Sequence, residues 1–93
     1  MIRSVQDPDT ERIFTRQGSR RCPPAIQGVA LRKLVLLNGA GTLGDLRIPP
    51  GKRLEKLRGE RTGQDSIRIT DQYRICFAWR DGDAYQVEIA DSH

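Results

Sequence analysis

Strict alternation of apolar and polar side chains in the C-terminal third of the chain constrains the fold more than any other feature. The apolar positions are Tyr73, Ile75, Phe77, Trp79, Tyr85, Val87 and Ile89. A period of two is typical of β-strands that bury one face. The run Asp81-Gly82-Asp83 separates the two segments and favours a tight hairpin turn. We therefore predict two neighbouring antiparallel strands whose shared apolar face needs a cover.

Two further strand-like segments precede this hairpin. Residues 53–58 predict a strand and residues 59–63 a hairpin loop. In residues 65–70, Ile67 and Ile69 share one face. The opposite face of the predicted sheet is polar and can stay open to solvent. Its side chains are Arg68, Arg74, Gln86 and Glu88.

The N-terminal half has the helical period of three to four residues instead. Residues 8–16 predict a short helix with Asp7 as its cap. Residues 25–37 predict a longer helix with one apolar stripe. The stripe consists of Ile26, Val29, Ala30, Leu34 and Leu37. Leu31 and Val35 widen it, so we expect this helix to pack against both the sheet and the first helix.

Helices that precede strands indicate an α+β fold. We predict one domain over residues 1–93, with two N-terminal helices packed on one face of a mainly antiparallel sheet. Residues 1–5 can add an edge strand, and residues 42–46 a single helical turn. The sequence contains no signal-like N-terminal apolar run and no apolar stretch of membrane length, so we expect a cytoplasmic protein.

The charge of the chain points to an anionic partner. The net charge is +4, and 13 Arg outnumber 3 Lys. The planar fork of Arg matches phosphate better than the Lys ammonium does, so this bias favours nucleic acid or an acidic protein. Cys22 and Cys76 form no CxxC pair, and the sequence has no clustered metal ligands, so we expect no metal ion and no cofactor.

His93 is the first candidate for catalysis. It is the single histidine of the sequence and its last residue, and it follows the final strand. Cleavage of RNA without a metal requires a base, an acid and cations that hold the phosphate. A neighbouring α-carboxylate would favour the charged imidazole, which suits an acid or a phosphate clamp. The alternative is a solvated terminal residue without a role.

The other candidates also have structural alternatives. Arg74, in mid-strand, is either an anion site or half of an ion pair with Glu88. Glu55 and Asp91 are candidate bases, although single carboxylates are mostly surface residues. Arg58 and Arg61 flank the predicted hairpin turn, where they either follow an RNA backbone or form a solvated rim. Lys52, Lys56 and Arg68 complete the predicted RNA-binding set.

Most of the chain resembles the HigB toxins of the RelE/ParE superfamily. The resemblance is carried by residues 1–4, 46–64, 66–69, 72–77 and 83–93, in this order and spacing. It implies the RelE-like α+β fold and a ribosome-dependent mRNA endonuclease that uses no metal. It also implies a HigA-type helix-turn-helix antitoxin as partner, and a complex that binds operator DNA.

The resemblance also implies roles for individual residues. The terminal triplet of the family, Asp-Tyr-His, falls on Asp91, Ser92 and His93. The family's strand arginine falls on Arg74, and its basic turn positions fall on Arg58 and Arg61.

Three positions depart from the family pattern. Some members have His at the position of Glu55, Ser92 replaces the tyrosine, and Asp65 replaces an aromatic residue or His. Ser92 cannot stack on a base, and Asp65 would repel phosphate unless it shares the face of Ile67. These departures suggest an alternative, a catalytically weakened module that mainly binds antitoxin and modulates operator binding. A topoisomerase poison of the ParE kind is a third reading, which the terminal His disfavours.

Overall fold

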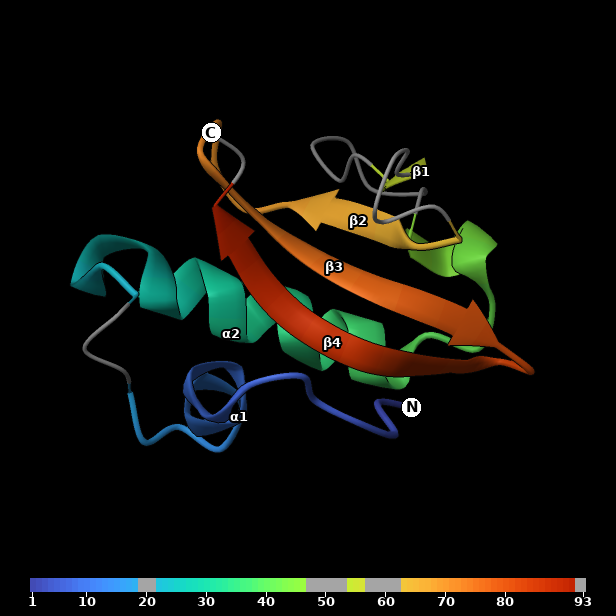
Figure 1. The fold of residues 1–93 in the computed structure, drawn as a ribbon, viewed down its shortest axis with the longest axis horizontal. Helices are drawn as coiled ribbons and strands as arrows, with labels where there is room; N and C mark the ends of the chain where they lie inside the picture. Colours follow the sequence, from blue (N-terminus) through green and yellow to red (C-terminus); the bar gives the residue numbers. More distant parts are fainter. Residues whose placement is uncertain (19–21, 47–53, 57–62, 92–93) are drawn as a thin grey trace.

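The computed structural model describes residues 1–18, 22–46, 54–56 and 63–91, with the backbone alone for 54–56. The elements are helices α1 (Pro8–Phe14) and α2 (Pro24–Gly39), the 3-10 helix η1 (Leu43–Leu46), and strands β1 (Leu54–Lys56), β2 (Asp65–Arg68), β3 (Tyr73–Arg80) and β4 (Asp83–Asp91). The strands form one antiparallel sheet in the order β1-β2-β3-β4. Both α-helices lie on one face of it (Figure 1). The predicted α+β architecture is therefore confirmed.

The N-terminal segment runs along the outer edge of β4. Ile2 and Val5 form isolated parallel bridges with Ala84 and Val87, in place of the continuous edge strand that the sequence suggested. The amide of Ile2 also donates to the side-chain oxygen of Asn38 on α2, at 2.9 Å. The segment thus covers the free edge of β4 and connects it to the helical layer.

Helix α1 begins at its predicted cap and is attached to the sheet through that cap. Asp7 accepts hydrogen bonds from the backbone N–H of Thr10 at 3.3 Å and from its hydroxyl at 2.6 Å. The same hydroxyl accepts from the backbone N–H of Ile89 on β4, at 3.0 Å. Thr10 is 1% exposed, so these bonds lie inside the protein. They join the first turn of α1 to the last strand.

The core lies between α2 and the sheet. Its largest side chains are Phe77, Leu34, Leu37, Leu46, Ile67, Ile75 and Val87. The buried positions of α2, Ala30, Leu34 and Leu37, repeat at three and four residues, as expected for one helix face. The predicted packing of this helix against both the sheet and the first helix is confirmed. Val35, which was expected to widen the apolar stripe, is nevertheless 48% exposed.

The β3–β4 hairpin has the predicted tight turn, and Arg80 pairs with Asp83, so the turn consists of two residues. Asp81 and Gly82 both have positive φ, 51° and 81°, as a type I′ turn requires. A bulge then interrupts the register between Cys76 and Ala78, and Gln86 on β4 has φ 54°. The extra residue reverses the alternation of side chains along β4.

The bulge corrects one predicted face. Tyr85 pairs with Ala78 on the helix-free face, so it does not share the apolar face of Val87 and Ile89. Ala84 takes the core position instead and is fully buried. The guanidinium of Arg80 lies 4.5 Å from the centre of the Tyr85 ring, a cation–π contact.

Candidate functional site

The helix-free face of the sheet brings two predicted phosphate-binding residues together. Arg68 on β2 and Arg74 on β3 are direct register partners. Side chains in such positions start about 5 Å apart, and like charges placed there destabilise a sheet. Two guanidinium groups on neighbouring strands offer a pair of planar donor forks to one anion. This arrangement favours a phosphate site at the Arg68–Arg74 pair.

The turn between β2 and β3 holds Arg68 in this position. The hydroxyl of Thr70 accepts from the backbone N–H groups of Gln72 and Tyr73, at 3.2 and 3.1 Å. The Ile69 N–H donates to the carbonyl of Tyr73 at 2.9 Å. These bonds close the turn, so the backbone on which the Arg68–Arg74 pair stands is fixed before any ligand binds.

Arg68 is only partly neutralised. Its Nη1 lies 3.2 Å from a carboxylate oxygen of Asp71, whose side chain is 98% exposed. An ion pair with so exposed a carboxylate contributes little. The Nε of Arg68 is buried and has no hydrogen-bond partner among the residues that the structure describes. A buried donor without a partner favours a bound anion, because leaving it unpaired is costly.

Asp91 lies at the same end of the sheet but on its other face. It pairs with Tyr73, whereas Ala90 is the partner of Arg74. Its Oδ2 accepts a hydrogen bond from Gln72 Nε2 at 3.2 Å. The register therefore places Asp91 on the helical face, one residue along β4 from the position opposite Arg74.

Several predicted site residues are not described by the structure, or are described by their backbone alone. Ser92, His93, Arg58, Arg61 and Lys52 lie outside the described residues. Glu55 and Lys56 are described by backbone alone, as register partners of Ser66 and Asp65.

The register of Glu55 continues across all four strands on the helix-free face. Glu55 pairs with Ser66, Ser66 with Cys76, and Cys76 with Glu88. Ser66 and Cys76 on the two inner strands are both buried. The centre of this face is therefore shielded from solvent, although the sequence suggested that the whole face could stay exposed. A row with a glutamate position at each end therefore lies beside the Arg68–Arg74 pair. The sequence alone gave no strand order from which to place Glu55 and Glu88 in one row.

The Asp65 carboxylate does not reduce the attraction of this face for an anion. It is 7% exposed and pairs with Phe77, on the side of the helices. The expectation that it shares the face of Ile67 is confirmed, so it does not point at the Arg68–Arg74 pair.

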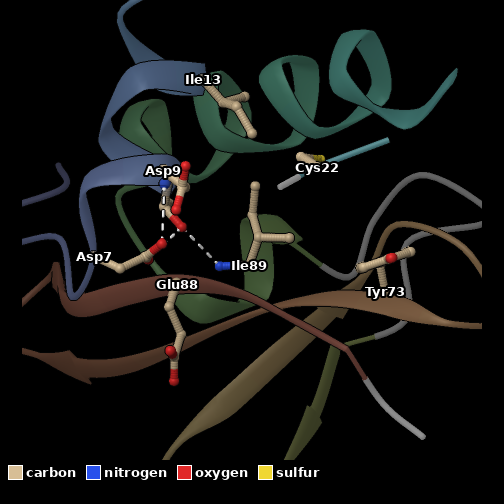
Figure 2. A pocket seen from close by; sticks show the side chains of 8 residues that line it. Asp7, Asp9, Ile13, Cys22, Tyr73, Glu88 and Ile89 are labelled. Atoms are coloured by element: carbon tan, nitrogen blue, oxygen red, sulfur yellow. Dashed lines mark hydrogen bonds between the residues drawn. The ribbon is translucent and has the colours of Figure 1, made fainter. Parts of the chain in front are cut away.

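A hollow lies on the helical side, between α1 and the ends of β3 and β4 (Figure 2). It measures about 250 Å³, and Asp7, Asp9, Cys22 and Tyr73 are among its lining residues. Figure 2 shows Glu88 pointing to the opposite side of β4 from Ile13 and Cys22. Burial and the nearby Asp9 carboxylate raise the pKa of the Cys22 thiol, so it stays protonated. The carboxylates of Asp7 and Asp9 and a neutral thiol do not suit a phosphate, so this hollow is a poorer anion site than the Arg68–Arg74 pair.

Comparisons with known proteins show which family the chain is similar to. A family model described as RelE-like toxin of type II toxin-antitoxin system HigB matches residues 3–93. Toxin HigB-1 of Vibrio cholerae serotype O1 is 48% identical to the chain over 63 residues, which cover 68% of the chain and 66% of that toxin. The match thus spans slightly less than two thirds of this relative. Among the residues that the structure describes, no helix has the length and apolar character needed to cross a bilayer.

Proposed function

Because this chain belongs to the HigB-like family of RelE-like toxins of type II toxin–antitoxin systems, we propose that it stops growth by cutting mRNA on the ribosome without a metal ion. The observation that carries the proposal is the Arg68–Arg74 pair on the helix-free face. Two arginines held opposite each other, one with a buried unpaired Nε, suit the scissile phosphate and the charge that grows on it.

The proton transfers then fall to residues around this pair. We assign His93 as the acid that protonates the leaving oxygen, because its ordinary pKa is close to neutral. Glu55 is the candidate base, since its register row lies beside the pair on the same face. Asp91 and Ser92 orient the terminal segment and the 2′-hydroxyl. Because Asp91 belongs to the other face, it is a weaker candidate for the base than Glu55.

The RNA continues over the basic residues near the β1–β2 connection. Arg58, Arg61, Lys52 and Lys56 belong to this path in the proposal, as contacts to backbone phosphates. Such contacts supply affinity and register but little sequence preference. The choice of message is then set by the ribosome, which presents a single-stranded codon to the toxin.

The toxin works in the cytoplasm and is neutralised by a HigA-type antitoxin, and the pair represses its own operator. Membership of a type II family implies an antitoxin. The helix-turn-helix character of that antitoxin and the binding of operator DNA are parts of the proposal. Co-purification of the two proteins and a mobility shift of the promoter fragment test them directly.

The experiment for the nuclease maps transcript ends after induced expression. One reporter message is translated, and its matched control lacks only the start codon. We expect new 5′ ends inside the coding region of the translated message alone, and loss of these ends with His93→Ala. Equal cleavage of both messages would exclude ribosome dependence. Undiminished cleavage by His93→Ala would remove this histidine from the mechanism.

The second candidate is a toxin fold with little nuclease activity that mainly binds antitoxin. Asp65 no longer favours it, since this residue lies on the helical side of the sheet. Ser92, at the position where the family resemblance implies a base-stacking tyrosine, still does. The measurement is growth arrest by the natural chain and by Ser92→Tyr. Arrest that appears only with Ser92→Tyr would favour the binding module, and full arrest by the natural chain would exclude it.

A further inference from the structure

Helix α2 has apolar side chains on the side that faces away from the sheet. The structure describes all of this helix, and its exposed residues are Pro24, Ala25, Gly28, Arg32, Val35, Leu36 and Gly39. Apart from Arg32 this outer stripe is apolar or small, and Val35 and Leu36 are 48% and 44% exposed. A surface helix normally carries polar residues on its outer side, and a helix that is apolar all round is normally covered.

The outer stripe borders a groove between α2 and the end of α1. One hollow contains Gln17, Gln27 and Gly28, and a second contains Val35 and Leu36. The two hollows share Arg16 and Leu31, so they form one groove along about three turns of α2. An ideal Cβ on Gly28 would meet nothing within 4 Å, so a partner backbone has close access there. The length of the groove along α2 suits one helix of a partner.

The charges around this groove indicate what kind of partner it can bind. Arg16 and Arg32 line it, none of the described residues that line it is a carboxylate, and α2 itself contains no acidic residue. Neither arginine has an ion-pair partner among the described residues. In a symmetric pair of copies each Arg16 and Arg32 would meet like charges, which opposes self-association. An amphipathic helix with acidic residues flanking its apolar side fits both the groove and its rim.

We propose that the α2 groove docks an acidic amphipathic helix of the antitoxin. Val35, Leu36 and Leu31 take its apolar side chains, and Arg16 and Arg32 pair with its carboxylates. This inference rests on the proposed partner class. Helices α1 and α2, which border the groove, lie on one face of the sheet (Figure 1). The Arg68–Arg74 pair is on the helix-free face, so this contact leaves the phosphate site uncovered.

The test measures binding of the purified antitoxin of the same operon to the full chain by calorimetry. The double substitution Val35→Ser with Leu36→Ser removes the apolar contact at half-exposed positions, so the variant should remain folded, and its melting temperature checks this. We expect binding to weaken about 10- to 100-fold. Arg32→Glu tests the charge, and Arg12→Glu is its matched control, with the same charge change at an exposed arginine of α1 outside the groove. Arg32→Glu should weaken binding about tenfold more than Arg12→Glu.

Three results would overturn the inference. The first is unchanged antitoxin affinity in the serine variant, and the second is an equal effect of the two glutamate variants. The third is a natural chain that sediments as a dimer and becomes a monomer on the serine substitutions, which would assign the groove to a second copy. Cleavage assays keep the two proposals apart. A natural chain that cuts no mRNA, while its serine variant loses antitoxin, would refute the nuclease and leave this inference standing.

Discussion

Thr10→Val should destabilise the protein strongly although it changes the side-chain volume very little. The Thr10 hydroxyl donates to Asp7 at 2.6 Å and accepts from the N–H of Ile89 at 3.0 Å, and the residue is 1% exposed. Valine removes both bonds and leaves the Ile89 N–H without its acceptor. A lost bond to a charged group costs about 1.5–3 kcal/mol, and a buried unpaired donor about 1–3 kcal/mol.

Part of this cost is recovered, since Asp7 still accepts from the Thr10 backbone N–H and is reachable by water. We therefore expect the free energy of unfolding to fall by about 2–4 kcal/mol, which lowers the melting temperature by roughly 10–25 °C in a domain of this size.

Urea unfolding followed by circular dichroism measures this change. Thr15→Val is the matched control, because the Thr15 hydroxyl also donates a hydrogen bond, in this case to the backbone carbonyl of Glu11 at 3.0 Å, but is exposed. The control should change stability by no more than about 0.5 kcal/mol. Equal effects of the two substitutions, or a Thr10→Val protein as stable as the natural chain, would refute the reasoning that this hydroxyl joins α1 to β4.

Further predictions concern the β3–β4 hairpin and the N-terminal segment. A hydrogen bond from the Arg3 side chain lowers the pKa of Asp83, so its contribution to stability is present above the ordinary carboxyl pKa and is lost as the pH falls through the lowered value. Asp83→Asn should therefore reduce the loss of melting temperature between pH 6 and pH 3, and an unchanged pH profile would contradict this. Gln86 has φ 54°, so Gln86→Gly should be neutral or stabilising, whereas Gln86→Val should cost about 1–2 kcal/mol in urea unfolding. Gly82 has φ 81°, where a side chain is strained. Gly82→Ala should therefore destabilise the protein by about 1 kcal/mol, and equal stability would argue against the type I′ turn.

The sequence predicted the elements well because their causes are local. The cap Asp7, the Asp81-Gly82 turn and the alternation of Tyr73 to Trp79 each act within a few residues, and the structure places all three as expected. The bulge at Gln86 was not predictable in this way. Nothing in the sequence of β4 marks the extra residue of the bulge, which moves Tyr85 to the other face.

The candidate site was predictable as a list of residues but not as an arrangement. The strand pattern placed Arg68 and Arg74 on one face, but only the strand register makes them direct partners. The same register puts Asp91 on the other face, opposite Tyr73. The exposed Val35 was misjudged because periodicity shows which side of a helix is apolar and not how much of that side the neighbouring elements cover.

The most direct test of the Arg68–Arg74 site is the rate at which a programmed ribosome loses intact mRNA to the purified toxin in a single turnover. The comparison is between Arg74→Ala and Arg12→Ala, an exposed arginine of α1 outside the site. If Arg74 holds the scissile phosphate, Arg74→Ala should slow cleavage about 100-fold, as removal of one charge-stabilising donor typically does, and Arg12→Ala should not. A rate for Arg74→Ala within about twofold of the control would contradict the assignment.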